Sequence, residues 1–399
     1  MTLPPGPVHL RQVRTGNLQA LLRAMLEGPA SRAELAQRTG LTKATIASLA
    51  EPLLRQGILT EDPEVNTGRG RPSRPLRFSD AAPVAIGAEI NVRHLAVSVQ
   101  RLDGSTAATR RVDLDNRRRG VDDLIDRLAA LIRATLAESG LEPLGFGLAV
   151  PGIVHDGTVV HAPNVPALTG VRIGDRLAAA LAAPMVEVDN EANLAALAHV
   201  WPHRLAGDDF VYVSGDVGVG AGIVLGGTLF RGGSGFAGEL GHVIIERGGR
   251  PCSCGSHGCV EQYAGLQAIL ATAGHQRLDQ LHNALRDGDT RSRSAVNCAG
   301  SALGTALASL INICDVATVL LGGSYATVFD EFAPGVRAEL GTGVLAAARR
   351  PVALAASPLG RDAVTRGAAG LITHRYCLTP ELLLEFDPNA TVDGRSTTA

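Results

Sequence analysis

The sequence is poor in aromatic residues, in lysine and in long apolar runs. Phe, Trp and Tyr make up 3% of the 399 residues, which argues against a protein that stacks single-stranded nucleic acid on aromatic side chains. Lysine occurs once, at Lys43, and we interpret the excess of arginine as codon bias. No apolar run approaches the roughly 18 residues of a membrane span, and the N-terminal residues contain no hydrophobic signal segment. We therefore expect a cytoplasmic protein of two or three domains with no membrane partner.

Cysteine is also scarce, but half of it is concentrated in one segment. Three of the six cysteines fall within eight residues, ten residues after a histidine, in the segment GELGHVIIERGGRPCSCGSHGCVE. Thiolates and imidazole are the usual ligands of a closed tetrahedral zinc site, and the intervening glycines allow the loop to turn back on itself. The spacing predicts a structural zinc ion in a loop of residues 242–259, with the ligands His242, Cys252, Cys254 and Cys259.

Other interpretations of this cysteine cluster remain open. The residues are free cysteines in a glycine-rich loop if no metal binds, and His257 is a possible substitute for His242. A disulfide is disfavoured because a reducing cytoplasm is expected. Two carboxylates, Glu239 and Glu261, flank the cluster and would be held beside the metal loop to bind a polar ligand.

The first 80 residues predict a winged helix-turn-helix, with domain bounds of 8–78. They carry 11 Lys and Arg against 7 Asp and Glu, a net charge of +4, whereas the rest of the chain has a net charge of −6. Apolar periodicity predicts three helices within residues 17–57, with a capping box at Ser31 and Glu34. A strand at 58–60 and the basic loop GRGRPSRP (68–75) resemble a wing. The expected DNA contacts are Thr42, Lys43, Thr45 and Ser48 on the third helix, and Arg69 and Arg71 in the wing. The alternative is a small protein-docking bundle.

From Val84 onward, two similar runs of elements follow each other. Strands at 84–90, 95–101 and 107–114, a helix at 121–138 and a strand at 145–150 form the first run. Strands at 210–214, 221–225, 228–230 and 317–321 recur in the second, with the cysteine loop and further helices inserted. Such a repeat suggests an ancient duplication with a ligand in the cleft between the copies. The polar tail at 388–399 is expected to be disordered.

The cysteine run with its upstream GELGH resembles the signature of the ROK family (repressors, open reading frames and kinases). The resemblance covers roughly residues 84–378, and the winged helix-turn-helix in front resembles the repressor branch. It implies an α/β fold, in which two actin-like, ribonuclease-H-like lobes bind a sugar or sugar derivative in a cleft stiffened by zinc. The family's sugar-contacting positions match Asn164, Asn190, Glu239, His242 and Glu261, with Glu191 beside them; His242 would bind zinc through one ring nitrogen and face the sugar through the other.

The positions that carry kinase chemistry in this family depart from its pattern. The first phosphate loop should read Asp-x-Gly-Gly-Thr, but the chain has Glu89 to Arg93 without glycine, so backbone amides are not presented to phosphates. Glu191 replaces the aspartate that acts as the general base, and Asp216 puts a negative charge in the second phosphate loop. We therefore predict no catalytic residue and no enzyme activity.

These patterns together predict a sugar-responsive transcriptional regulator, a repressor, that binds double-stranded operator DNA as a homodimer or tetramer. An ATP-dependent, glucokinase-like sugar kinase with an added DNA-binding head is the alternative. A zinc-stabilised interaction protein without a small ligand is a third possibility.

Overall fold

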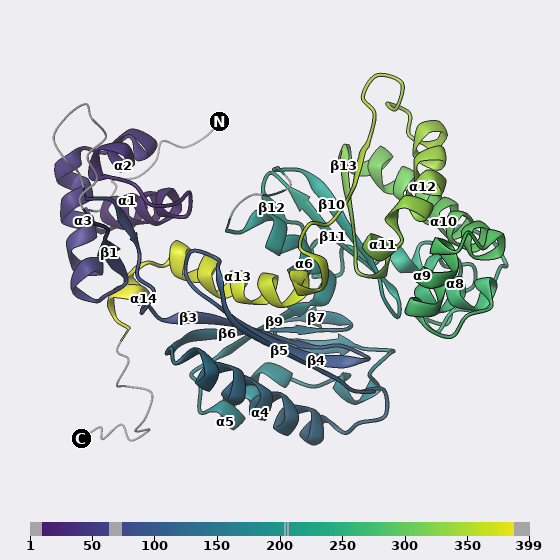
Figure 1. Cartoon of the computed structure of the whole chain (residues 1–399), viewed down its shortest axis with the longest axis horizontal. Helices are drawn as coiled ribbons and strands as arrows, with labels where there is room; N and C mark the ends of the chain where they lie inside the picture. Colours follow the sequence, from purple (N-terminus) through teal and green to yellow (C-terminus); the bar gives the residue numbers. More distant parts are fainter. Residues whose placement is uncertain (1–9, 64–73, 203–204, 206, 387–399) are drawn as a thin grey trace.

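The computed structural model describes residues 10–63, 74–202, 205 and 207–386. It consists of a helical head and two lobes, each built on a five-stranded sheet (Figure 1). The fold class is therefore the expected one, α/β, with a winged helix-turn-helix in front of two actin-like lobes. The predicted wing tip with Arg69 and Arg71 and the predicted tail at 388–399 lie outside the described residues.

The head, residues 10–63 and 74–78, packs three helices against a short antiparallel hairpin. Its second helix begins at the predicted capping box: Glu34 N–H donates to Ser31 Oγ at 3.3 Å, and Ser31 N–H donates to Glu34 Oε2 at 2.8 Å. Gly40 ends this helix at φ 72°, a conformation that suits glycine. The first helix begins at Leu10, earlier than the predicted Asn17. The elements are α1 (Leu10–Met25), α2 (Arg32–Thr39), α3 (Lys43–Arg55), β1 (Leu59–Glu61) and β2 (Leu76–Phe78).

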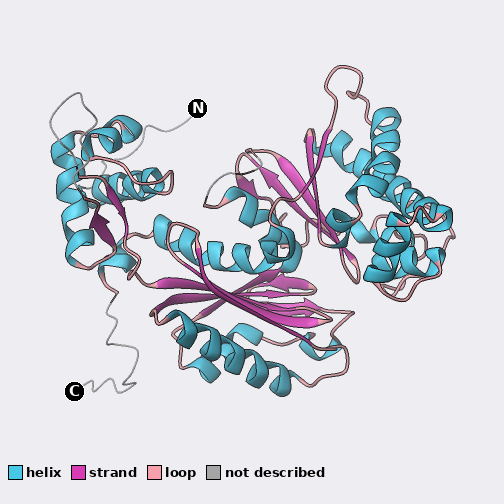
Figure 2. Cartoon of the chain, viewed as in Figure 1, coloured by secondary structure: helices cyan, strands magenta, loops and turns pink. Residues whose placement is uncertain are grey.

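The first lobe has the strand order β5-β4-β3-β6-β9. The pairs β5–β4 and β4–β3 are antiparallel, and β3–β6 and β6–β9 are parallel. Helices α4 and α5 cover one face of the sheet (Figure 2). A separate hairpin, β7–β8, follows β6. The elements are β3 (Val84–Ile90), β4 (His94–Gln100), β5 (Thr106–Asp113), α4 (Val121–Ser139), β6 (Pro143–Val150), β7 (Ile153–His155), β8 (Thr158–His161), η1 (Pro166–Leu168), α5 (Ile173–Leu181) and β9 (Val186–Asn190).

The second lobe repeats this topology in the order β12-β11-β10-β13-β14. Its fifth strand, like β9 in the first lobe, was not predicted from the sequence. The segment between β12 and β13 contains the cysteine loop and four helices. The elements are β10 (Phe210–Gly215), β11 (Val219–Leu225), β12 (Thr228–Leu229), η2 (Leu240–His242), α7 (Glu261–Ala264), α8 (Leu266–Ala273), α9 (Leu278–Arg286), α10 (Thr290–Cys314), β13 (Thr318–Gly322), α11 (Ser324–Thr327), α12 (Phe329–Gly343), β14 (Ala353–Ala356) and η3 (Gly360–Asp362).

Helix α10 is, within the described residues, the one helix long and apolar enough to cross a membrane. Of its most apolar window, 56% is buried inside the protein. Its apolar residues share one core with those of α8, α12 and the second sheet, so we interpret α10 as a core helix.

The last helix of each lobe crosses to the other lobe. Helix α6 (Glu191–Val200) packs on β10 and β11 of the second sheet, and α13 (Ala363–Leu378) packs on β3 and β6 of the first. Glycines allow this close approach: a Cβ at Gly87 would lie 1.8 Å from Thr365 O, and one at Gly147 would lie 2.0 Å from Ala368 O. The two helices also pack on each other, where a Cβ at Gly367 would lie 1.6 Å from Leu194 O. The lobes are therefore joined by interlocked helices.

The head is packed against the end of α13 and the short α14 (Glu381–Leu384), as Figure 1 shows at the left of the molecule. Cys377 and Leu383 are buried in the same apolar cluster as the core of the head. Gln19 Nε2 of α1 donates to Leu378 O at 2.6 Å. The head therefore rests on the helix that crosses between the lobes.

Candidate functional site

A cavity of about 350 Å³ lies between the two lobes, and we call it the smaller cavity. Its volume falls within the range of small-molecule sites. The first lobe contributes side chains after β8, at the end of β9 and at the start of α6, and the second contributes side chains around η2 and at the start of α7. All six residues predicted to contact sugar line this cavity: Asn164, Asn190, Glu191, Glu239, His242 and Glu261.

Asn190 is fixed by the helix that it caps. Its Oδ1 accepts hydrogen bonds from the backbone N–H groups of Ala192 at 2.8 Å and Asn193 at 3.3 Å, and its Nδ2 donates to Gly152 O at 2.8 Å. Both lone pairs of Oδ1 are used, so one amide hydrogen of Nδ2 remains for a ligand. A side chain held in this way loses little entropy on binding, so Asn190 is preorganised at the cavity wall.

Gly218, in the turn between β10 and β11, leaves room for the carboxylate of Glu261. Val219 N–H donates to Glu261 Oε2 at 3.3 Å. A Cβ at Gly218 would lie 2.3 Å from that same oxygen, so any other residue there would push the carboxylate away. Gly218 therefore makes room for the Glu261 carboxylate in the smaller cavity.

The predicted metal ligands form one compact cluster. The His242, Cys252, Cys254 and Cys259 ligand atoms all lie within 4.8 Å of one another. Cys254 Sγ lies 3.7 Å from Cys259 Sγ, and His242 Nδ1 lies 3.7 Å from Cys252 Sγ. A tetrahedral ion with Zn–S bonds of about 2.3 Å and a Zn–N bond of about 2.0 Å requires S···S near 3.8 Å and N···S near 3.5 Å. The four residues could therefore hold a metal ion such as zinc.

The chemistry of these donors also fits a cation. Burial raises the pKa of the Cys259 thiol to about 12, and the neighbouring Cys254 and Cys252 add to the rise. Three thiolates so close together need a positive charge between them, which a divalent ion supplies. His257, the alternative ligand, is exposed in the same loop and is not part of the cluster. His242 faces the cluster with Nδ1, while its Nε2 lies 4.0 Å from Glu239 Oε2.

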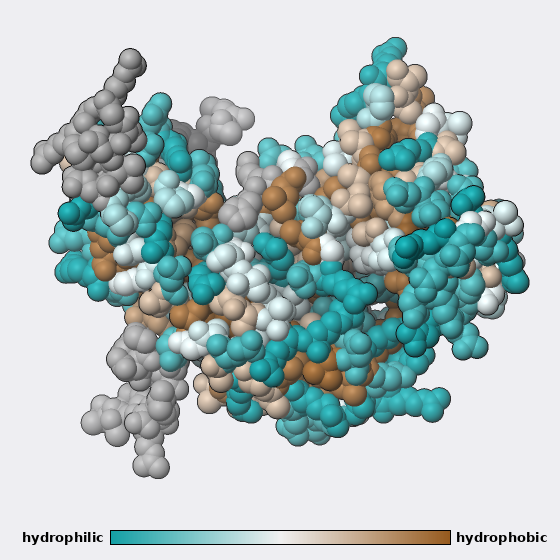
Figure 3. Space-filling view, in the orientation of Figure 1, coloured by the Kyte–Doolittle hydropathy of each residue, from teal (hydrophilic) through white to brown (hydrophobic). Residues whose placement is uncertain are grey.

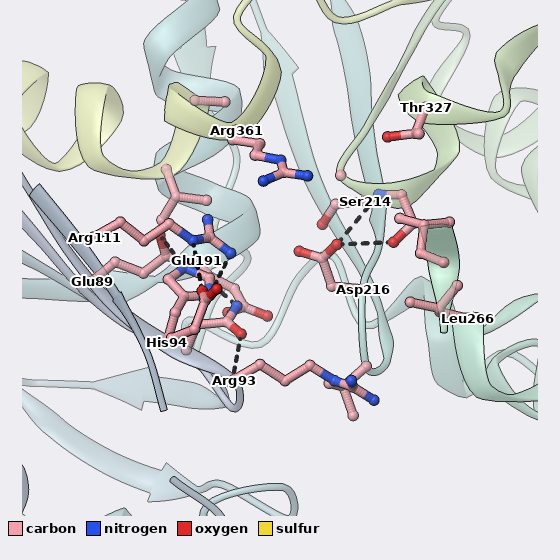
Figure 4. A pocket seen from close by; sticks show the side chains of 18 of the residues that line it. Glu89, Arg93, His94, Arg111, Glu191, Ser214, Asp216, Leu266, Thr327 and Arg361 are labelled. Carbon is pink, nitrogen blue, oxygen red and sulfur yellow. Dashed lines mark hydrogen bonds and ion pairs between the residues drawn. The ribbon is translucent and has the colours of Figure 1, made fainter. Parts of the chain in front are cut away.

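A larger cavity of about 600 Å³ lies on the other side of a shared wall. Four residues border both cavities: Asn91, Glu191, Asp216 and Val217. The space-filling view shows a hollow where the two lobes meet (Figure 3). In the larger cavity, Arg93 and Arg361 extend from opposite sides, and Asp216 lies between them (Figure 4).

The turn that follows β3 borders the larger cavity, and the backbone N–H groups of Asn91 and Arg93 in this turn already donate hydrogen bonds within the chain. Asn91 Oδ1 accepts the Arg93 N–H at 3.1 Å, and Asn91 N–H donates to His94 O at 3.0 Å. Val92 is buried, at 4% exposure. A phosphate would find no free N–H on Asn91 or Arg93 at this turn.

Carboxyl groups gather at the wall between the cavities. Glu89 Oε2 lies 3.2 Å from His94 Nε2, and Asp216 Oδ1 accepts hydrogen bonds from the Ser324 N–H at 3.3 Å and from the Ser324 hydroxyl at 3.2 Å. Desolvation raises the pKa of Glu191 to about 8, and the charges of Glu89 and Asp216 add to this rise. Asp216 therefore places its carboxyl group at the turn before α11. The raised pKa of Glu191 favours its protonated form near neutral pH.

The four described residues predicted to contact DNA lie at the start of α3. Thr42 is the N-cap, with its Oγ1 accepting the Thr45 N–H at 3.1 Å. Thr42, Lys43 and Ser48 are exposed, while Thr45 is half-buried and its hydroxyl lies 2.9 Å from that of Thr42. Lys43 and Ser48 are therefore the side chains with the most freedom to reach a partner.

Three residues near the smaller cavity were not singled out in the sequence. Asn91 lines both cavities, and its Nδ2 lies 3.5 Å from Glu191 Oε2. Asp189, next to Asn190, makes an ion pair with Arg231 at 2.6 Å across the two lobes. The only sequence signal for Asp189 was its position beside a predicted sugar contact, and Arg231 had none because its partner is distant in the chain.

Comparison with known proteins gives a consistent result. The model of the ROK family matches residues 85–375. The xylose repressor of Bacillus subtilis (strain 168) is 27% identical over 373 residues, which cover 91% of this chain and 96% of the repressor.

Two solved structures differ in how much of this chain they match. A ROK family transcriptional regulator, a homologue of the Escherichia coli MLC protein, is 25% identical with a TM-score of 0.78 and covers 94% of this chain and 100% of its own. A ROK family glucokinase from Streptomyces griseus, in complex with glucose and AMPPNP, is 26% identical with a TM-score of 0.65. It covers 72% of this chain but 98% of its own. Regulators therefore match nearly the whole chain, whereas this kinase matches a smaller part of it. With the family model matching most of its length, the chain belongs to the ROK family.

Proposed function

We propose that this protein is a sugar-responsive transcriptional repressor. The observation that carries the proposal is the joint presence of a winged helix-turn-helix and a smaller cavity lined by amides, carboxylates and an imidazole. Such groups match the hydroxyl array of a sugar, because each hydroxyl both donates and accepts hydrogen bonds. The similarity to the xylose repressor and to the MLC homologue supports the same function.

In this proposal a structural zinc ion bound by His242, Cys252, Cys254 and Cys259 fixes the loop beside Glu239 and Glu261. The zinc supplies a rigid anchor, and the side chains of the chain bind the sugar. Lys43 and Ser48, with Thr42 and Thr45 at the start of α3, contact the major groove. The protein acts as a homodimer or tetramer, so its operator has two-fold symmetry.

The coupling between sugar and DNA runs through the interlocked helices. Asn190 and Glu191 open α6, α6 packs on α13, and α13 leads into the core of the head through Cys377. A shift of α6 on sugar binding would therefore move α13 and, with it, the head. Since α13 also packs on the first sheet, such a movement changes how the head lies relative to the lobes.

The decisive experiment titrates the purified protein onto DNA from upstream of its own gene and of neighbouring sugar genes, with and without a sugar panel led by D-xylose. We expect specific binding that one sugar weakens by at least about tenfold, the usual scale of allosteric coupling. Lys43→Ala should lower the dependence of affinity on salt by about one charge, while Arg286→Ala on α9 should not. Operator affinity that no sugar alters would overturn the proposal.

A sugar kinase with an added head is the second candidate, and it rests on the glucokinase similarity. Two observations count against it. The amides of Asn91 and Arg93 already donate hydrogen bonds within the chain, and Asp216 places a carboxyl group in the second phosphate loop. ATP-dependent phosphorylation of D-xylose or D-glucose by the purified protein would establish it.

A further inference from the structure

A loop of the second lobe reaches across the smaller cavity to the first lobe. Residues 231–238 follow β12, and we call them the strap. Both ends of the strap lie on β11: Phe230 N–H donates to Ile223 O at 2.7 Å, and Gly238 approaches Ala221 O so closely that a Cβ would lie 2.3 Å away. The strap closes on itself through a hydrogen bond from Ala237 N–H to Arg231 O at 3.1 Å. It is thus a closed loop rooted in the second sheet.

The tip of the strap rests on the first lobe at two places. Phe236 lies edge-on to His155 of β7, with ring centroids 6.0 Å apart and an interplanar angle of 66°. Gly235 approaches β7 as well, since a Cβ there would lie 3.3 Å from Val154 O. Three strap or strap-end residues, Gly235, Ala237 and Gly238, line the smaller cavity. The strap therefore bridges the lobes at the edge of the proposed sugar site.

One ion pair ties the strap to the wall of that site. Arg231 donates to Asp189 Oδ2 from Nε at 3.1 Å and from Nη2 at 2.6 Å. The other oxygen, Asp189 Oδ1, accepts the Asn190 N–H at 2.7 Å and Asn193 Nδ2 at 3.0 Å. The Asp189 side chain is only 9% exposed. A single carboxylate thus holds the strap with one oxygen and the start of α6 with the other.

We propose that Arg231 and Asp189 are positioning residues that hold the strap closed over the smaller cavity and so retain the sugar bound there. The retention rests on the proposed sugar binding; the closure rests on the contacts of the strap alone. The lobes cannot separate at this edge unless the Arg231–Asp189 pair breaks. Because Asp189 is nearly buried, the loss of Arg231 leaves its charge without its cationic partner, which favours an open strap. Opening also removes a constraint from Asp189, which positions Asn190.

The test compares Arg231→Gln and Asp189→Asn with a matched variant, Arg172→Gln. Arg172 pairs with Asp175 at 2.6 Å within the first lobe, so its variant removes an arginine ion pair that does not join the lobes. Asp189→Asn keeps an oxygen that can accept the Asn190 N–H. The first measurement is amide hydrogen exchange of residues 231–238 in the sugar-free, full-length protein. We expect exchange about tenfold faster in both strap variants, no additional gain in the double variant, partial rescue by Arg231→Lys, and no change in Arg172→Gln.

The second measurement is the dissociation rate of D-xylose and of D-glucose. We expect Arg231→Gln to raise it about tenfold while the association rate stays the same or rises, whereas a variant that only damaged the site would bind more slowly as well. Strap exchange equal to that of Arg172→Gln would overturn the proposal, and so would faster exchange with an unchanged dissociation rate. If neither sugar binds the unaltered protein, the proposed function fails for these sugars, and the exchange data still decide whether the ion pair closes the strap.

Discussion

The smaller and larger cavities share a wall but differ in what their polar groups have left to offer. In the smaller cavity, Asn190 keeps one amide hydrogen for a ligand, and Glu239 Oε2 and His242 Nε2 lie 4.0 Å apart, too far for a hydrogen bond between them. In the larger cavity, the amide of Arg93 is used by Asn91, and Asp216 is used by Ser324. The Arg93 amide and the Asp216 carboxyl are thus hydrogen-bonded within the chain, whereas Asn190 still has one donor for a ligand.

This difference separates what the binding of a ligand requires from what phosphoryl transfer requires. Binding needs polar groups that remain unpaired until the ligand arrives, whereas phosphoryl transfer also needs amides and positive charge around the phosphates. Asn91 and Arg93 in the turn at residues 89–94 have no free amide for a phosphate, and Asp216 adds a carboxyl group where phosphoryl transfer needs positive charge. The fold keeps its cleft and its two lobes, which the proposed response to a sugar requires.

The largest effect should come from the metal cluster. We expect Cys259→Ser, or treatment with a chelator, to release about one equivalent of zinc and to weaken sugar binding by about 100-fold or more. The reason is that structural zinc sites contribute about 10 kcal/mol or more to folding, and the proposed zinc would fix the loop beside Glu239 and His242. Metal analysis and calorimetric sugar titration measure both effects. Cys298→Ser, an exposed cysteine of α10 outside the cluster, is the control and should leave both unchanged. Retained sugar affinity after complete metal loss would contradict the prediction.

A smaller but still large effect should come from the neutralisation of one carboxylate in the smaller cavity. Glu239→Gln keeps the shape of the side chain but replaces a charged acceptor, and hydrogen bonds to charged groups are worth about 1.5–3 kcal/mol. We expect sugar affinity to fall about 10- to 100-fold, with the melting temperature of the sugar-free protein nearly unchanged. The matched control is Glu142→Gln, an exposed glutamate of the first lobe away from the cavity. Equal affinities of the two variants would mean that Glu239 does not face the sugar.

The sequence predicted best those features that depend on neighbouring residues. The capping box at Ser31, the strand pattern from Val84 and the spacing of the cysteines are local, and the elements and ligand atoms lie where these patterns put them. The fifth strands were missed because they are short: Val186–Asn190 alternates over only four residues before its polar end, and Ala353–Ala356 has only four residues, all apolar. Their strand conformation comes from pairing with β6 and β13, which no local pattern records.

The contacts that join distant segments could not be predicted at all. The glycine-poor turn at Asn91 suggested weak phosphate binding, but not that the Asn91 side chain would consume the Arg93 amide. The Arg231–Asp189 pair depends on how the two lobes meet, 42 residues apart in the chain. Such contacts follow from tertiary packing, so the sequence could indicate which residues would line the cavity but not how they would pair.

A moderate effect should appear in the pH dependence of stability. The pKa of Glu191 is raised to about 8 in the folded protein from 4.5, so folding favours the protonated form. Below about pH 4.5 Glu191 is neutral in both states and costs nothing; between 4.5 and 8 stability falls as pH rises; above 8 the penalty is constant. We expect the wild type to lose at most about 3 kcal/mol between pH 6 and 8.5 relative to Glu191→Gln, measured by urea unfolding. Parallel stability curves for the two proteins would show that Glu191 is ionised at neutral pH.

The smallest effect should come from an attempt to restore kinase chemistry. Glu191→Asp moves the carboxylate back by one carbon–carbon bond, about 1.5 Å, and Asp216→Gly removes the opposing charge. Neither change frees the Arg93 amide that Asn91 uses, nor moves Val92 out of the turn. We therefore expect the double variant to transfer no radiolabelled phosphate from ATP to D-xylose or D-glucose above a protein-free blank. Transfer in the double variant alone would show that the two carboxyls were the only barrier. The hydrogen-bonded amides of Asn91 and Arg93 would then have no part in preventing phosphoryl transfer.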